Sequence, residues 1–276
     1  MIQKSDKHFL FSVDLEDVRE NVVNGFSYKD RVEENTQLYL TWLKNKKVQC
    51  TFFVVGKIAE RYPSLIKQII DDGHEIACHS YSHLTLDKQN KESFKLDLEK
   101  NLDALTSAGA KNVVGFRAPV FSLTEQTQWA HEVLIELGFK YSSSVLPAQN
   151  PLFGWKEFGT QPKLINNTLW ELPITHGRFG PLNFPTAGGI YFRVFPWFVL
   201  KNNIATCFKN NQPLLSYFHP YDVDTKQEHF MHDGINNSTF YNFLMYYNRK
   251  NVFNRLNKLN AFNAKIITYA EYLKTL

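Results

Sequence analysis

The chain has 276 residues, of which 43% are hydrophobic and 21% are charged, and it contains only 11 prolines and 13 glycines. This composition excludes a disordered or linker-rich protein and is typical of a globular chain with a large core. The 31 basic and 27 acidic residues give a formal charge of +4, and because the basic residues are scattered along the chain, the sequence does not predict binding to nucleic acid.

Predicted elements alternate along the first half of the chain. The predicted strands cover, in chain order, 9–13, 48–55, 74–78, 112–116 and 140–145. The first two predicted helices between them cover 32–44 and a segment that begins at Pro63 and ends at Gly73. The third covers 94–105 and ends before Gly109. The fourth begins at a capping box of Ser122 and Glu125 and ends at Gly138. Such alternation indicates parallel strands joined by crossover helices.

The second half is less regular. Residues 146–162 are rich in proline, glycine and aromatic residues and predict a long loop, while 166–174, 214–218 and 265–268 predict strands and 196–209 and 238–257 predict helices. About seven strand–helix alternations favour a closed or partly closed (β/α) barrel over an open doubly wound sheet. We expect one α/β domain over residues 1–276, with loop insertions.

Cysteine usage and apolar segments indicate the compartment. Three widely spaced cysteines fit a reducing environment better than a disulfide framework. Residues 1–7 lack the apolar stretch of a secretory signal, and the most apolar later segment, 190–200, is interrupted by Arg193 and Pro196 and is shorter than the roughly 20 residues that cross a bilayer. We therefore expect a cytoplasmic protein with no integral membrane segment.

Polar residues follow several predicted strands, and in a barrel the strand ends meet at one rim. His79 and His83 are four residues apart, so on a helical turn they would point the same way and could hold one divalent metal; the alternative is a pair of polar surface histidines. Asp14, Glu16 and Asp17 follow the first strand and could supply a carboxylate ligand, or could cap a helix or form a solvated turn.

Two further candidates come from later strands. Arg117 could orient a carboxylate at the rim, with a surface salt bridge as the alternative. His219 lies between an apolar strand and Pro220, so its imidazole would project from a rigid strand end; the alternative is a buried structural histidine. Two histidines and one carboxylate leave open positions on a metal for water and a substrate carbonyl, which is typical of hydrolytic sites.

These segments resemble the motifs of the polysaccharide deacetylase superfamily, carbohydrate esterase family 4. The resemblance rests on five segments in order: Phe11–Asp17, Thr51–Gly56, His79–His83, Gly115–Pro119 and Tyr217–Asp224. A further segment, Gly188–Arg193 followed by Pro196, and the segment Tyr217–Asp224 resemble the later motifs of a branch associated with bacterial exopolysaccharide and surface-glycan biosynthesis. The resemblance implies a distorted barrel of about seven parallel strands and a metal-dependent N-deacetylase acting on an N-acetylated amino sugar.

The resemblance also implies residue roles: Asp14 as catalytic base, His79 and His83 as metal ligands, Arg117 as the residue that positions the base, and His219 as general acid. The family usually has two adjacent aspartates in the first motif, whereas Leu15 follows Asp14 here. The third ligand is therefore open between Asp17, which we favour slightly, and Glu16. One divalent ion is expected, zinc first, with cobalt, nickel, manganese or iron as alternatives.

Other features remain open. The family's fourth motif has its nearest candidate in Trp170–Pro173, and the aromatic residues Tyr81, Phe121, Trp155 and Tyr221 are candidate sugar platforms, with core packing as the alternative. Two competing functions are hydrolysis of a non-glycan amide, such as a cyclic imide or ureide, and glycan binding without turnover. The sequence does not determine the exact substrate or the oligomeric state.

Overall fold

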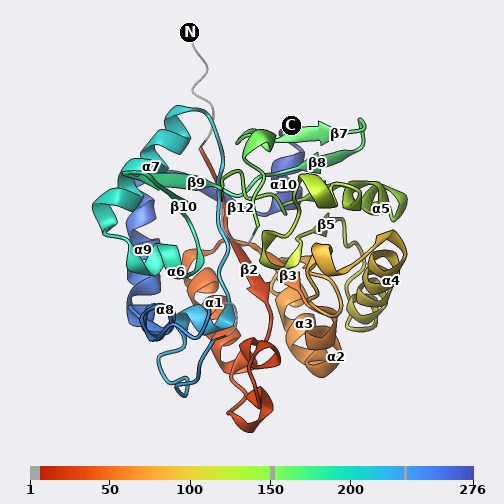
Figure 1. Ribbon diagram of the computed structural model, residues 1–276, viewed down its shortest axis with the longest axis horizontal. Helices are drawn as coiled ribbons and strands as arrows, with labels where there is room; N and C mark the ends of the chain where they lie inside the picture. Colours follow the sequence, from red (N-terminus) through yellow and green to blue (C-terminus); the bar gives the residue numbers. More distant parts are fainter. Residues whose placement is uncertain (1–6, 150–152, 233–234) are drawn as a thin grey trace.

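The computed structural model describes residues 7–149, 153–232 and 235–276, and Figure 1 shows its strands at the centre with helices around them. The expectation for the N-terminus falls mostly on residues 1–6, and part of the expected long loop falls on 150–152; both lie outside the described residues. The strands are β1 (His8–Leu10), β2 (Ser12–Leu15), β3 (Thr51–Val54), β4 (Glu75–Cys78), β5 (Gly115–Phe116), β6 (Tyr141–Ser142), β7 (Lys163–Ile165), β8 (Leu169–Glu171), β9 (His176–Phe179), β10 (Leu182–Pro185), β11 (Leu214–Leu215) and β12 (Lys265–Ile267).

The central element is a seven-stranded sheet in the order β2-β3-β4-β5-β6-β8-β7. Its strands run parallel from β2 to β8, and only the edge strand β7 is antiparallel. A second sheet, β11-β1-β12, is also parallel, and a single parallel bridge between Val13 and Phe218 joins the two. The sheet is therefore rich in parallel strands, as the alternation of elements predicts.

The expected barrel is not confirmed. Among the described residues, no backbone ladder joins β8 to β11; they are linked through Thr175, whose hydroxyl accepts a hydrogen bond from the Leu215 amide at 2.8 Å. The amides of Leu172 and Ile174 still donate to the carbonyl oxygens of Ser142 and Val145. The chain then forms an antiparallel hairpin, β9–β10, that the sequence analysis missed. Its turn contains Gly180 at φ 59°, directly before Pro181, a pair that is a recognised turn signal.

Most of the helices lie where the sequence predicts them. They are α1 (Val32–Lys46), α2 (Gly56–Arg61), α3 (Pro63–Asp71), α4 (Lys91–Ser107), α5 (Ala130–Glu136), α6 (Gly189–Val194), α7 (Trp197–Lys209), α8 (Thr239–Tyr246), α9 (Val252–Lys258) and α10 (Tyr269–Leu273). Helix α3 has proline in its first turn and buries Leu65, Ile66 and Ile69 against the sheet, which confirms that prediction. Among the described helices, none combines the length and the apolar character that a membrane span requires.

Two helix predictions need correction. The capping box is formed by Thr124 and Thr127, not by Ser122 and Glu125, because the Ser122 hydroxyl accepts a hydrogen bond from the Leu86 amide instead. The single helix expected over 238–257 is divided into α8 and α9, because Asn248 takes a left-handed conformation at φ 60° and ends the first helix.

Candidate active site

Polar side chains from separate strand ends meet at one edge of the central sheet. Asp14 lies near the end of β2, Glu16 follows it, His79 follows β4 and Arg117 follows β5. Since these strands are parallel, their carboxyl ends lie on the same side, and the Val13–Phe218 bridge brings His219 there as well. The structure thus brings together residues that are more than 200 positions apart in the sequence.

Arg117 fixes the orientation of Asp14. Its guanidinium is fully buried and its Nη1 lies 2.5 Å from Oδ1 of Asp14. The same guanidinium donates to the hydroxyls of Ser12 at 2.9 Å and Tyr269 at 2.7 Å, and it lies 3.9 Å from the ring centre of Phe53. Because so many contacts hold the cation, the carboxylate of Asp14 is held in one orientation.

Glu16, His79 and His83 form a compact set of possible ligands. One ligand atom of each lies within 4.8 Å of the others, and the Nε2 of His83 is 2.6 Å from Oε2 of Glu16. Nδ1 of His79 is 2.8 Å from the carbonyl oxygen of Arg117; because a carbonyl can only accept, Nδ1 carries the proton and the lone pair of Nε2 is available to a metal. Two imidazoles and one carboxylate fit the donor chemistry of a zinc-type site.

The protonation of the two imidazoles differs. Burial lowers the pKa of His79 to about 4, although the nearby charge of Asp14 acts in the opposite direction. Burial also lowers the pKa of His83, but the charge and hydrogen bond of Glu16 outweigh it, and the pKa of His83 lies above its usual value. His79 is therefore neutral at physiological pH, as a metal ligand must be.

The two histidines do not lie on a helical turn, contrary to our expectation from their spacing. Ser80 and His83 both take left-handed conformations, at φ 59° and φ 57°. Asp97 on α4 holds the bend, because its carboxylate accepts hydrogen bonds from the amides of Tyr81 at 2.7 Å and Ser82 at 3.0 Å. The imidazoles reach 5.0 Å between ring centres because of this bend, not because of helical geometry.

Asp17 does not join this set. Its carboxylate forms ion pairs with Arg19 at 2.7 Å and Arg61 at 2.8 Å, and it accepts a hydrogen bond from the amide of Arg19 as the N-cap of a 3-10 helix over Val18–Asn21. The slight preference for Asp17 as the third ligand does not fit this geometry, which places Glu16 beside the histidines. Strand β2 ends at Leu15 and the 3-10 helix begins at Val18, so Glu16 lies in the short connection between them.

His219 is held by a buried chain of charges. Its Nδ1 lies 2.9 Å from Oδ2 of Asp222, whose Oδ1 accepts from Nε of Arg193 at 3.0 Å. Burial lowers the pKa of His219, but the hydrogen bond and charge of Asp222 outweigh it and raise the pKa to about 9. Nε2 of His219 is 3.8 Å from Oε1 of Glu16. A protonated imidazole is therefore held beside the possible metal ligands.

The sequence analysis assigned no role to Asp222 or Arg193, although both lie in segments that carry the family resemblance. The signal for Asp222 is its position three residues after His219, where its carboxylate caps the 3-10 helix Pro220–Val223. Nothing local marks Arg193, which comes from α6 and contacts Asp222 only in the folded chain.

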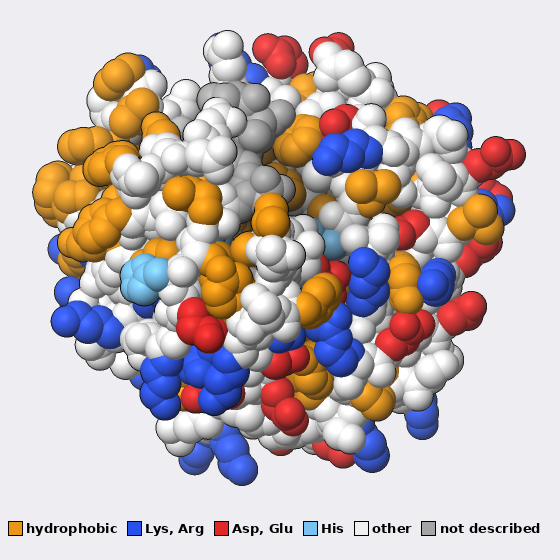
Figure 2. Space-filling model, turned by 60° about the horizontal axis from the view of Figure 1, so that its bottom comes forward, with side chains coloured by type: hydrophobic (Ala, Val, Ile, Leu, Met, Phe, Trp, Pro, Cys, Tyr) orange, Lys and Arg blue, Asp and Glu red, His pale blue; other side chains and the backbone are white. Residues whose placement is uncertain are grey.

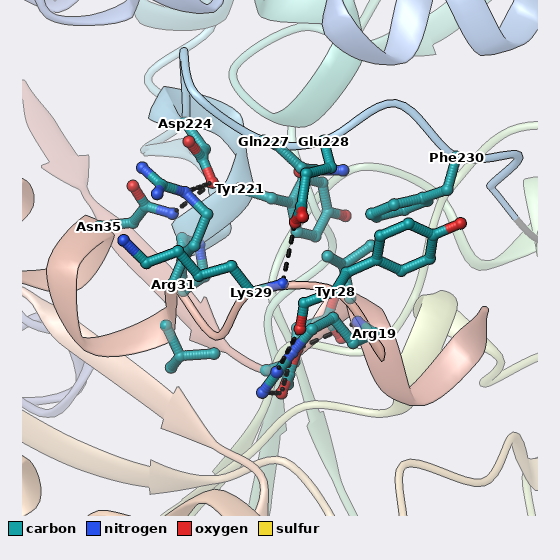
Figure 3. A pocket seen from close by; sticks show the side chains of 15 residues that line it. Arg19, Tyr28, Lys29, Arg31, Asn35, Tyr221, Asp224, Gln227, Glu228 and Phe230 are labelled. Carbon is teal, nitrogen blue, oxygen red and sulfur yellow. Dashed lines mark hydrogen bonds and ion pairs between the residues drawn. The ribbon is translucent and has the colours of Figure 1, made fainter. Parts of the chain in front are cut away.

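A small pocket opens beside Glu16, between the segment 16–35 and the segment 220–230 (Figure 3). The rings of Tyr28 and Phe230 lie 4.8 Å apart, and Tyr221 stacks on His219 with 4.6 Å between ring centres. Some charged groups in the pocket are paired, as Arg31 is with Asp224 at 2.6 Å. The pocket therefore combines aromatic rings with polar and charged side chains.

Of the four candidate sugar platforms, only Tyr221 lines this pocket. Phe121 is buried and contacts Tyr217 edge-on, Trp155 contacts Phe158, and the hydroxyl of Tyr81 donates to Glu60. Glu171, from the candidate fourth motif, is fully buried and accepts hydrogen bonds from the amides of residues 144 and 145. It stabilises the sheet and does not reach the Glu16 set.

A buried histidine beside the pocket predicts that the free energy of unfolding depends on pH. His232 lies beside Phe230 of this pocket, with 5.0 Å between ring centres, and is 4% exposed. Burial and then the charges of Arg249 and Arg193 lower its pKa to about 3. A lowered pKa contributes stability above pH 6.5 that is lost as the pH falls toward 3. We expect the free energy of unfolding to fall on the order of 2 kcal/mol more between pH 7 and pH 5 in the wild type than in His232→Gln. Urea titrations at the two pH values measure this difference, and equal losses in the two proteins would contradict it.

Comparison with known proteins gives two family matches. Residues 19–142 match the family described as polysaccharide deacetylase, and residues 143–272 match a family described as a domain of unknown function (DUF3473). The first match includes His79, His83 and Arg117, and the second includes His219. A peptidoglycan-N-acetylglucosamine deacetylase of Bacillus cereus is 34% identical over 100 residues, which cover 36% of this chain and 36% of that protein. The matches thus span about a third or less of the length of the first curated relatives.

Solved structures share the fold. A structure from Mycobacterium smegmatis assigned to the polysaccharide deacetylases has a TM-score of 0.57 at 20% identity, over 80% of this chain and 79% of that chain. The PuuE allantoinase has a TM-score of 0.56 at 13% identity, over 80% of each chain. At such identities the likeness concerns the arrangement of the elements.

Proposed function

Because the chain belongs to the polysaccharide deacetylase superfamily, we propose that it is a metal-dependent hydrolase that removes N-acetyl groups from an amino-sugar-containing glycan or glycan precursor. The observation that carries this proposal is the set of buried Glu16 and His79 with partly buried His83, beside Asp14 and His219 at the same sheet edge. Relatives that match part of the chain are peptidoglycan deacetylases, which supports an N-acetylated sugar as the substrate.

Glu16, His79 and His83 would hold one divalent cation, zinc first, which when bound lowers the pKa of a water molecule and polarises the acetyl carbonyl. Asp14, oriented by Arg117, accepts the proton of the attacking water. His219 gives its proton to the departing nitrogen, and Asp222 holds the imidazole through Nδ1 so that Nε2 carries the proton that is transferred. The products are acetate and a free amino sugar.

A role in surface polysaccharide biosynthesis and a cytoplasmic location are part of the same proposal. The three cysteines, Cys50, Cys78 and Cys207, are buried and unpaired, which supports a reducing compartment. The segment Gly188–Arg193, which resembles the surface-glycan branch, contributes Arg193 to the charge chain behind His219.

The ligand assignment gives a first test. We expect about one divalent ion per chain in the wild type and in Asp17→Asn, because Asp17 is engaged by two arginines. Glu16→Gln should bind zinc at least about tenfold more weakly, since a neutral amide is a poor zinc ligand. Competition titration with a chromogenic chelator measures both affinities. Weaker binding in Asp17→Asn alone would return the ligand role to Asp17.

The function itself is tested by product analysis. The zinc-loaded chain is incubated with N-acetylated glycan oligomers, nucleotide-linked and lipid-linked N-acetyl amino sugars, and allantoin as a cyclic ureide. We expect acetate and free amine in equal amounts from at least one N-acetyl amino sugar. Ring opening of allantoin without acetate release would favour the amidohydrolase alternative, and glycan binding without any product would favour a non-catalytic protein.

A further inference from the structure

Acidic residues are unevenly distributed in the chain. Although the sequence contains 27 of them, residues 172–221 and 234–270 include no aspartate or glutamate. These two stretches form α6, α7, α8 and α9 and the hairpin β9–β10, which lie together on the left side of Figure 1. They carry exposed cations, among them Arg178, Lys201, Lys250 and Lys258. All the charged side chains that these elements contribute to this side of the molecule are therefore positive.

The same side exposes large aromatic residues. Helix α8 has no buried residue, and Phe240, Tyr241, Phe243 and Tyr247 at and after it are 64%, 56%, 59% and 44% exposed. Phe240, Phe243 and Tyr247 follow the i, i+3, i+7 spacing of one helix face. Soluble monomers rarely leave such a stripe uncovered.

The hairpin extends this surface. Its tip exposes Phe179 by 46% and Leu182 by 58%. Helix α6 lies between the tip and α8, because it packs against both β10 and α8, and Phe179 contacts Phe195 directly after α6 with 6.0 Å between ring centres. Figure 2 shows hydrophobic side chains gathered along this edge. We call Phe179, Leu182, Phe240, Tyr241, Phe243 and Tyr247 the aromatic face.

We propose that the aromatic face docks on the surface of an anionic lipid bilayer. Aromatic rings partition into the interface between headgroups and acyl chains, and neighbouring lysines and arginines are attracted to anionic headgroups. A second copy of the chain fits less well, because pairing two such surfaces would bring positive side chains together with no acidic partner from 172–221 or 234–270. The positive charge of this surface favours an anionic partner, and its exposed rings favour a partner that also offers an apolar region.

The docking surface is connected to the active site. Nη1 of Arg193 donates to the carbonyl oxygens of Met245 at 3.0 Å and Tyr247 at 2.8 Å, at the end of α8, while its Nε holds Asp222 behind His219. A bilayer under α8 would therefore lie at the side of the molecule that supports the general acid. Docking there suits a substrate whose sugar is attached to a membrane lipid. This inference goes beyond the proposed function, and the proposed deacetylase reaction does not depend on it.

The test measures vesicle binding of the full chain by co-sedimentation. Vesicles contain either phosphatidylcholine alone or phosphatidylcholine with 30% phosphatidylglycerol. The proteins are the wild type, the double variant Phe240→Ser/Phe243→Ser, and the control Leu96→Ser, whose side chain on α4 is 67% exposed outside the aromatic face. We expect binding to the anionic vesicles only, weakened at least tenfold in the double variant and by 0.5 M salt, and unchanged in Leu96→Ser.

Three results would overturn the inference. The first is wild-type protein that stays in the supernatant with anionic vesicles, and the second is equal binding to both kinds of vesicle, which would remove the charge argument. A dimer in analytical ultracentrifugation that the double variant converts to a monomer would assign the face to a second copy. Thermal unfolding of the double variant shows that it is folded, and its acetate release from a soluble substrate should equal that of the wild type, so failure of docking is distinguishable from failure of the deacetylase proposal.

Discussion

Asp14→Asn is expected to lower acetate release by roughly 10²–10⁴-fold while zinc remains bound, because the substitution removes a general base but none of the three proposed ligands. The amide of asparagine cannot accept the proton of the attacking water at neutral pH. Acetate release and metal content are measured on the same sample. Loss of the metal from Asp14→Asn would show that Asp14 is a ligand, and full activity would exclude it as the base.

The same substitution should reduce stability. It leaves the fully buried guanidinium of Arg117 without its anionic partner, and breaking a buried ion pair from one side costs about 3–5 kcal/mol. Asp71→Asn is a matched control, because its pair with Lys67 is exposed and such pairs contribute about 0–1 kcal/mol. Guanidinium titration distinguishes the two variants, and equal midpoints would contradict a stabilising buried ion pair between Asp14 and Arg117.

Arg193→Met is the second substitution with a large expected effect. It leaves Asp222 as a buried charge without Arg193 and removes the donors to the end of α8, so we expect a loss of about 3–5 kcal/mol in the free energy of unfolding. Acetate release should also fall, because Asp222 no longer holds His219 in one orientation.

Two further variants make this result specific. Arg193→Lys keeps a positive charge near Asp222 and should recover part of the stability, although it cannot reproduce the fork of donors. Lys91→Met removes one partner of the exposed pair with Glu132 and should cost about 0–1 kcal/mol. A cost for Arg193→Met as small as that for Lys91→Met would show that the charge chain does not stabilise the fold.

Local pattern predicts much of the sheet and its helices. The strands β3 and β4 and the helix α3 follow from apolar spacing with proline and glycine at the ends. The hairpin β9–β10 was missed because its apolar residues do not alternate regularly along the two strands. Within the described part of the chain, these strands pair with each other and with no other strand. The described strands do not close into a barrel because the chain forms this hairpin between β8 and β11. Counting predicted strands does not detect such a hairpin.

The site illustrates the same limit. The spacing of His79 and His83 correctly indicates that the rings lie close together, but the helical turn assumed for them is replaced by a bend that Asp97 holds from α4. The choice between Glu16 and Asp17 depends on Arg61, which reaches Asp17 from α2. Contacts between distant segments form only in the folded chain, so the sequence alone does not predict them.

The most direct test of the account is a titration of the metal-free chain with zinc, recorded as acetate release from an N-acetylated amino-sugar substrate found by the product analysis. The account predicts that the rate rises linearly to one zinc per chain and then stays constant, and that His79→Ala shows no rise over the same range. Acetate release that is complete without added metal, or a chain that binds one zinc and releases no acetate from any N-acetyl amino sugar, would contradict it.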